Sequence, residues 1–153
     1  MSTLIRLSHN ASLLIYHFVC PAKYRRIVFD ETVDDELIII CQAIEDRYAI
    51  KFLEIGTDKD HVHFLIQSVP KLSPSQLMRT IKSITAREIF QKCPYVKKQL
   101  WGGEFWTDGY YVCTVGHHGT EETVRQYIKE QGREKEYKQL FSQQLELFPE
   151  LRS

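Results

Sequence analysis

Hydrophobic residues fall into two patterns along the chain, and the first predicts β-strands. Residues 13–20 (LLIYHFVC) form a continuous apolar and aromatic run of strand length that Pro21 closes. Residues 50–55 and 61–69 have the same character and are joined by the turn-rich residues 56–60. The chain therefore contains at least three strands, and the last two are expected to form a hairpin.

The second pattern is an apolar stripe at three- and four-residue spacing, which predicts amphipathic helices. Residues 32–48 carry such a stripe, and acidic residues gather near its start, which suits the positive end of a helix dipole. Residues 74–90 carry another, with Ser73 as the expected N-cap and Pro74 at the first helical position. A third helix is expected over residues 121–131.

The order of elements predicts the fold class. Residues 27–29 read as a short continuation of the first strand, and residues 105–115 contain a strand-prone stretch that can pair with that strand. Residues 116–119 (GHHG) then form a glycine-bracketed hinge before the third helix. The result is an α+β protein with a ferredoxin-like split βαβ arrangement: an antiparallel sheet with helices on one face. This fold hosts many functions and decides none of them.

Length and composition indicate one domain. The 153 residues suit a single hydrophobic core, which we expect over residues 1–132, followed by a charged, Gln-rich tail over residues 133–153 that begins as a helix and frays. The four cysteines form no Cys-x-x-Cys pair, which argues against a zinc knuckle and a disulfide framework. No segment has the length of a membrane span or the pattern of a signal peptide, so a cytoplasmic location is expected.

Net charge gives no sign of a nucleic-acid partner, because 20 basic residues balance 20 acidic ones. Local clustering is more informative. Three basic clusters are present: Lys23, Arg25 and Arg26; Arg79, Lys82 and Arg87; and Lys92, Lys97 and Lys98. Each cluster can bind phosphates, and the alternative for each is an ordinary solvated surface.

The candidate chemistry begins with His61 and His63. Alternate strand residues share a face, so the two imidazoles project together while Val62 points into apolar packing. Two imidazoles on one face can bind a divalent ion when a third ligand arrives from elsewhere. Taken alone, this pattern is a weak signal, because a chance His-x-His is common.

Tyr127 and Gln131 are the second candidate pair. Four residues apart on a helix, they face the same way. The simpler alternative is a packing aromatic and a solvated amide. Together with the histidines, however, they suffice for metal-assisted cleavage of a phosphodiester by a covalent route, because a bound cation can stabilise the charge that develops at phosphorus. The phenol, with an ordinary pKa of about 10, needs such help to act as a nucleophile.

At these residues the chain resembles the single-tyrosine HUH transposases of small bacterial insertion sequences, a name that stands for histidine, bulky hydrophobe, histidine. His61-Val62-His63 matches that motif, and residues 127–131 match the Tyr-x-x-x-Gln of the family's tyrosine helix. The resemblance also covers the first strand with its Lys-Tyr-Arg-Arg turn at residues 23–26, and the last core strand, from Trp101 through residues 109–116.

The resemblance implies a specific activity. Tyr127 would attack a phosphate of single-stranded DNA, giving a 5′-phosphotyrosine and a free 3′-hydroxyl, without ATP. His61, His63 and Gln131 would hold Mg²⁺ or Mn²⁺. Relatives act as dimers on DNA with subterminal hairpins, and in several the tyrosine helix is donated in trans to the partner's active site.

The resemblance also favours Lys23, Arg25 and Arg26 as DNA-binding residues over Arg79 and Lys82. Trp101, Phe105 and Trp106 can stack on unpaired bases, although at least two of the three are expected in the core or a dimer interface.

Three alternatives stay open at this point. A replication-initiator or relaxase-type nickase shares the histidine pair and tyrosine, but such chains are usually longer and sometimes carry paired tyrosines. A metal hydrolase would use His61 and His63 to activate water and would not need Tyr127. A non-catalytic or host-adopted relative would bind hairpin DNA without forming an adduct.

Overall fold

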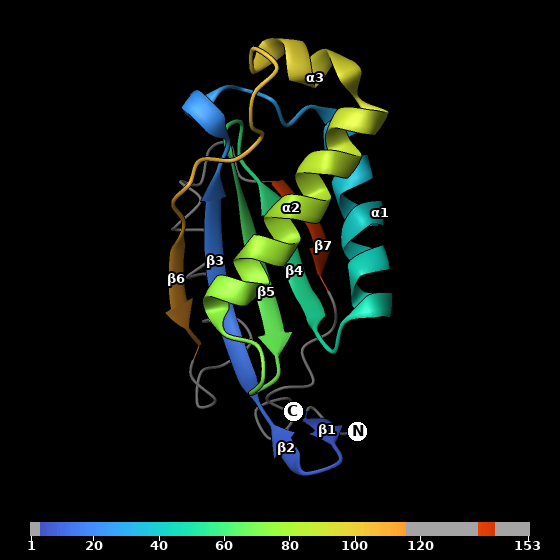
Figure 1. The fold of residues 1–153 in the computed structure, drawn as a ribbon, viewed down its shortest axis with the longest axis vertical. Helices are drawn as coiled ribbons and strands as arrows, with labels where there is room; N and C mark the ends of the chain where they lie inside the picture. Colours follow the sequence, from blue (N-terminus) through green and yellow to red (C-terminus); the bar gives the residue numbers. More distant parts are fainter. Residues whose placement is uncertain (1–3, 116–137, 143–153) are drawn as a thin grey trace.

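Three of the predicted strands pair as the centre of an antiparallel sheet (Figure 1). The computed structural model describes residues 4–115 and 138–142. The strands of this sheet are β3 (Leu14–Pro21), β4 (Lys51–Thr57), β5 (His61–Ser68), β6 (Tyr111–Thr114) and β7 (Lys138–Ser142). Their order across the sheet is β6-β3-β5-β4-β7, and every neighbouring pair is antiparallel. The first four strands have the order of a ferredoxin-like split βαβ sheet, which confirms the predicted fold class.

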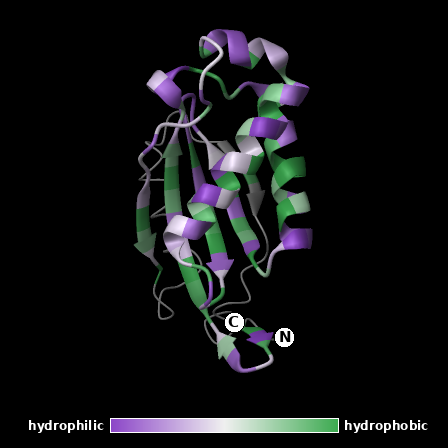
Figure 2. Ribbon diagram, viewed as in Figure 1, coloured by the Kyte–Doolittle hydropathy of each residue, from purple (hydrophilic) through white to green (hydrophobic). Residues whose placement is uncertain are grey.

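Two long helices cover one face of this sheet (Figure 1). They are α1 (Glu31–Arg47) and α2 (Pro74–Lys92). Alternate residues of the central strands, among them Phe18, Phe64 and Ile66, are wholly buried in the cluster that the helices complete. Figure 2 shows the apolar positions recurring along these strands and along α1. The apolar residues that alternate along the strands therefore pack against the apolar stripe of each helix to form one core.

Both predicted helix starts are capped by short polar side chains. The Asp30 carboxylate accepts a hydrogen bond from the backbone N–H of Val33, at 2.8 Å. Ser73 and Gln76 form a reciprocal capping box at the start of α2, and Pro74 occupies the first turn, as expected. These caps satisfy N–H groups that the first helical turn would otherwise leave without partners.

Several irregular segments differ from the sequence-based prediction. The strand expected at residues 27–29 is wrong: these residues run as an irregular connection, in which the N–H of Val28 donates to the carbonyl of Lys59. The strand-prone stretch within residues 105–115 forms β6 and pairs with β3, as predicted, and the loop before it is held by Lys82, which donates to the carbonyls of Thr107 and Gly109. Three short elements were not predicted: β1 (Ile5–Leu7), β2 (Asn10–Ser12) and α3 (Pro94–Gln99).

The segment after residue 132 contributes a strand. Residues 138–142 form β7, which pairs with β4, so the fraying expected for the tail is wrong for these residues. The helical start expected from residue 133 lies outside the described residues. Leu140 packs against the core cluster, which explains why this part of a charged segment joins the sheet. The hinge at 116–119 and the helix at 121–131, with Tyr127 and Gln131, lie outside the described residues. Within the described part of the chain, no helix is both long and apolar enough to cross a membrane.

Candidate metal centre

His61 and His63 lie side by side on the face of the sheet opposite α1 and α2. Their ring centroids are 4.9 Å apart. Val62 and Phe64, which alternate with them along β5, are fully buried in the hydrophobic cluster on the helix side. The strand therefore presents both imidazoles to one point, as the alternation of side chains predicted.

Asp58 joins the two histidines as a third potential ligand. The turn before β5 folds back on itself, and the N–H of Asp58 donates to the carbonyl of His61 at 2.9 Å. One ligand atom from each of Asp58, His61 and His63 lies within 4.8 Å of the others. Two imidazoles and a carboxylate suit a divalent cation, so these residues fit a metal ion. Asp58 was not predicted from the sequence, which shows it only as one of the polar residues in the turn before β5, because its approach to His61 depends on how that turn folds.

A second layer of residues holds His61. The Nδ1 atom of His61 is 2.7 Å from an oxygen of Asp60, and the Arg25 guanidinium donates to both oxygens of the same carboxylate, at 3.0 and 3.4 Å. Burial by itself raises the pKa of Asp60, but hydrogen bonds and charge from Arg25 and His61 outweigh it, so the net pKa is lowered. Asp60 thus stays an anion that orients the His61 ring.

His17 plays the corresponding part for His63. It projects from β3, with Nε2 at 3.0 Å from Nδ1 of His63 and the two rings nearly parallel at 12°. Burial lowers the pKa of His17 to about 4. Burial, followed by the nearby charges of His17 and His61, lowers the pKa of His63 to about 3. Both rings are therefore neutral at pH 7, the state in which imidazole binds metals. The sequence showed His17 only as part of the first-strand motif, because the contact depends on how β3 and β5 pair.

The structure also shows the neighbours of the predicted DNA-binding residues. Lys23 forms an ion pair of 3.0 Å with Glu104, and Arg26 stacks 4.4 Å above the ring of Trp101. Arg79 is exposed on α2, whereas Lys82 is engaged with the carbonyls of the 107–109 loop. Contacts with DNA for these residues, and for Arg25, remain a proposal.

The three aromatic residues near residue 105 separate into two groups. Phe105 and Trp106 are buried, and Trp106 Nε1 donates to Thr85 at 2.9 Å, which confirms that two of the three belong to the core. Trp101 is 70% exposed. Trp101 is therefore the member of this group whose ring is available to a ligand.

The site combines two histidines and a carboxylate at the start of β5, in a split βαβ sheet. Such a site suits a divalent cation and phosphate chemistry.

The comparisons with known proteins identify the family. The family described as "Transposase IS200 like" matches residues 10–131. The chain belongs to the IS200-like transposase family and is a DNA-processing enzyme of that kind.

Individual relatives agree with this assignment. The chain is 30% identical over 118 residues to the ISDra2 transposase TnpA of Deinococcus radiodurans, covering 77% of this chain and 84% of that one. It is also 30% identical over 125 residues to the transposase for insertion sequence element IS200 of Salmonella typhimurium, covering 82% and 81%.

Two solved structures share the fold. A candidate transposase from Deinococcus radiodurans R1 matches with a TM-score of 0.66 and 29% identity, over 82% of this chain and 96% of that one. A REP-associated tyrosine transposase bound to a REP hairpin matches with a TM-score of 0.54 and 12% identity, over 81% and 69%, which shows a common fold alone.

Proposed function

We propose that this transposase cleaves and rejoins single-stranded DNA with Tyr127 as nucleophile and a divalent cation, Mg²⁺ or Mn²⁺, held by His61, His63, Asp58 and Gln131. The observation that carries the proposal is the convergence of Asp58, His61 and His63 within 4.8 Å, in a chain whose family acts on DNA. Asp58 is added to the ligand set on the ground of that geometry. Gln131 remains in it from the Tyr-x-x-x-Gln pattern.

The hydrogen bonds around the histidines indicate which nitrogen would bind the ion. His61 Nδ1 lies against Asp60, and His63 Nδ1 lies against His17. Nε2 of each ring is then the atom that would face the cation, with Nδ1–H donating to Asp60 in one case and to His17 in the other. Such outer partners fix the tautomer of a ligating histidine and increase its basicity.

The reaction is an exchange of phosphorus–oxygen bonds. When bound, the ion withdraws charge from a non-bridging phosphate oxygen and stabilises the transition state. The Tyr127 hydroxyl loses its proton as its oxygen forms a bond to phosphorus. The bond from phosphorus to the 3′ oxygen breaks, and that oxygen takes up a proton to become a 3′-hydroxyl, so the number of protons is unchanged. The 5′-phosphotyrosine retains the phosphodiester energy, so a second 3′-hydroxyl can reverse the step without ATP.

The partners follow from the same proposal. We expect the substrate to be DNA with subterminal hairpins, in line with the hairpin bound by a REP-associated transposase of the same fold. We also expect a homodimer, in which the tyrosine helix of one subunit can serve the active site of the other.

The decisive experiment uses the full chain and single-stranded DNA copied from both flanks of its gene, with Mg²⁺ or with chelator. We expect a protein–DNA adduct that survives denaturation, forms only with metal, and maps by mass spectrometry to Tyr127. Tyr127→Phe should abolish the adduct. Tyr137→Phe, a change at the next tyrosine along the chain, is the matched control and should leave it intact.

The other outcomes identify the competing functions. Cleavage that persists in Tyr127→Phe would show a metal hydrolase that activates water. Hairpin binding with no adduct in any variant would show a protein that binds DNA without cutting it.

A further inference from the structure

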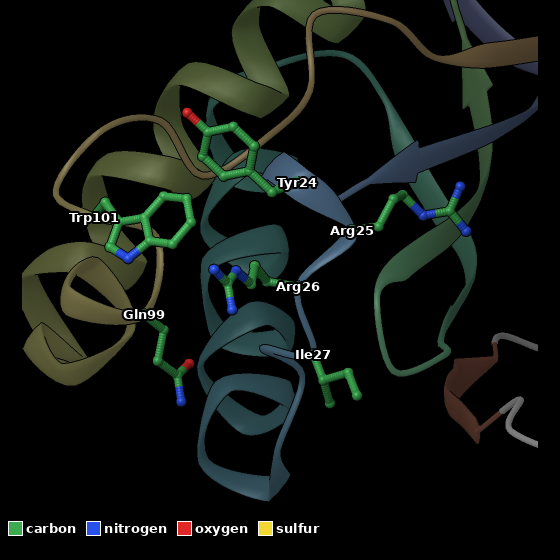
Figure 3. A pocket seen from close by; sticks show the side chains of 6 residues that line it. All are labelled: Tyr24, Arg25, Arg26, Ile27, Gln99 and Trp101. Carbon is green, nitrogen blue, oxygen red and sulfur yellow. The ribbon is translucent and has the colours of Figure 1, made fainter.

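A hollow of about 610 Å³ lies beside the basic turn that follows β3. Two chain segments line it: residues 24–27 of the turn, and Gln99 with Trp101 at the end of α3. Figure 3 shows Tyr24, Arg26 and Trp101 directed toward one another, whereas Arg25 points away from them.

The aromatic rings of this hollow are open to solvent. Trp101 is 70% exposed and Tyr24 is 58% exposed, and their centroids are 5.3 Å apart with planes tilted by 52°. Phe105 and Trp106 are buried in the core, whereas Tyr24 and Trp101 leave large aromatic rings exposed to solvent. Exposed apolar surface of this kind is typical of a binding site.

The backbone at the hollow is held in an uncommon conformation. Among the described residues, those other than glycine with positive φ are Tyr24, Arg25 and Trp101, at 60°, 51° and 55°, and all three border the hollow. Side chains with a Cβ adopt this region reluctantly, and such residues gather at ligand-binding sites. The positive φ angles of Tyr24 and Trp101 therefore coincide with the two aromatic side chains that border the hollow.

The charges around the rings favour an anionic ligand with a flat face. The Arg26 guanidinium lies 4.4 Å above the Trp101 ring, and none of the six lining residues is acidic. Gln99 adds an amide that can donate to and accept from the edge of a base. An aromatic platform beside a guanidinium is the combination that binds a nucleotide of a single strand.

The hollow is connected to the metal centre by Arg25. The backbone of Arg25 borders the hollow, while its guanidinium binds the Asp60 carboxylate that accepts from His61 Nδ1. Arg25 thus belongs both to the lining of the hollow and to the hydrogen bonds behind His61.

We propose that this Tyr24–Trp101 hollow binds one unpaired base of single-stranded DNA, stacked on Trp101, with Arg26 beside its phosphate. The inference rests on the proposed function, because the bound base would belong to the strand that Tyr127 cuts. It requires an unpaired base, since a paired one has its faces covered by stacking neighbours.

The test measures binding of the full chain, in chelator so that no cleavage occurs, to oligothymidylate of about 15 nucleotides, a length in the range that single-strand sites cover. A second probe has the same backbone with abasic sites throughout. Trp101→Ala should weaken binding of oligothymidylate about 5- to 100-fold, the loss expected for one base–aromatic stack, and leave the abasic probe unchanged. Trp101→Phe should retain most of the affinity, and Ile39→Ala, at an exposed apolar residue of α1, is the matched control.

Tryptophan fluorescence gives a second readout, because the chain has two tryptophans and Trp106 is buried. Oligothymidylate should quench the emission of the wild type, and the abasic probe should not. The proposal is overturned when Trp101→Ala binds both probes as the wild type does, or weakens both equally, since a backbone contact or loss of structure would then explain the change.

The adduct assay separates this inference from the proposed function. If Trp101→Ala binds oligothymidylate as the wild type does and the Tyr127 adduct forms, base binding in the hollow is rejected and the strand-transfer activity is retained. If binding depends on the base and on Trp101 but the wild type forms no adduct, base binding is retained and the strand-transfer activity is rejected.

Discussion

The two sides of the central strands β3 and β5 differ in what their side chains do. Toward α1 and α2, Phe18 and Phe64 are fully buried in the hydrophobic cluster. Toward the other side, the same pairing of β3 with β5 brings His17 to 3.0 Å from His63. One backbone ladder therefore supports the core on one side and positions the imidazoles on the other, which gives the candidate metal centre the rigidity that a catalytic geometry needs.

The largest expected effect comes from comparing one substitution on each face of β5, at Phe64 on the core side and at His61 on the side of the metal centre. Phe64→Ala should lower the free energy of unfolding by about 3–5 kcal/mol, because it leaves a cavity in the core. His61→Asn should abolish the adduct and change that free energy by only about 1 kcal/mol, since its amide can replace the donor to Asp60. Urea denaturation and the adduct assay measure the two quantities. A large loss of stability in His61→Asn would show that the histidine side also supports the fold.

The next largest effect is a loss of metal affinity when the residues that hydrogen-bond to the two histidines, His17 and Asp60, are replaced. His17→Phe keeps a ring stacked against His63 but removes the hydrogen bond, so we expect Mn²⁺ affinity to fall by about 10- to 100-fold. Asp60→Asn should weaken binding in the same range through His61. Calorimetric titration with Mn²⁺ checks both variants. Wild-type affinity in His17→Phe, with an unchanged melting temperature, would limit His17 to a packing role.

The smallest effect is a dependence of stability on pH in the metal-free protein. Burial holds the pKa of His17 at about 4 and that of His63 at about 3, whereas the unfolded chain titrates near its ordinary value of about 6.5. Below that value the unfolded state binds protons that the folded state does not, so the free energy of unfolding falls with pH. Above about pH 7 neither histidine contributes to the slope.

By about pH 5.5 the loss should be about 1 kcal/mol for each histidine. Urea titrations across this range in chelator check the slope, and His17→Phe should reduce it. A slope identical in the wild type and His17→Phe would mean that His17 binds protons equally in the folded and unfolded states, against the lowered pKa expected from its burial.

The part of the candidate site that depends only on the alternation of side chains along one strand was predictable from the sequence. The alternation of strand residues placed His61 and His63 on one face, and the structure confirms this. Asp58 was missed because its approach to His61 depends on a turn closed by one backbone hydrogen bond. The roles predicted for Tyr127 and Gln131 stay predictions, since both residues lie outside the described part of the chain.

The sequence by itself determined the elements whose signals are local: two capped amphipathic helices, three central strands, and a His-x-His pair with a common face. Only the tertiary structure decided which distant residues meet. It brought His17 behind His63, Arg25 onto Asp60, residues 138–142 onto the edge of the sheet, and Tyr24 beside Trp101. The physical reason is that strand register and loop packing are set by the whole core, whereas periodicity and capping are set within a few residues.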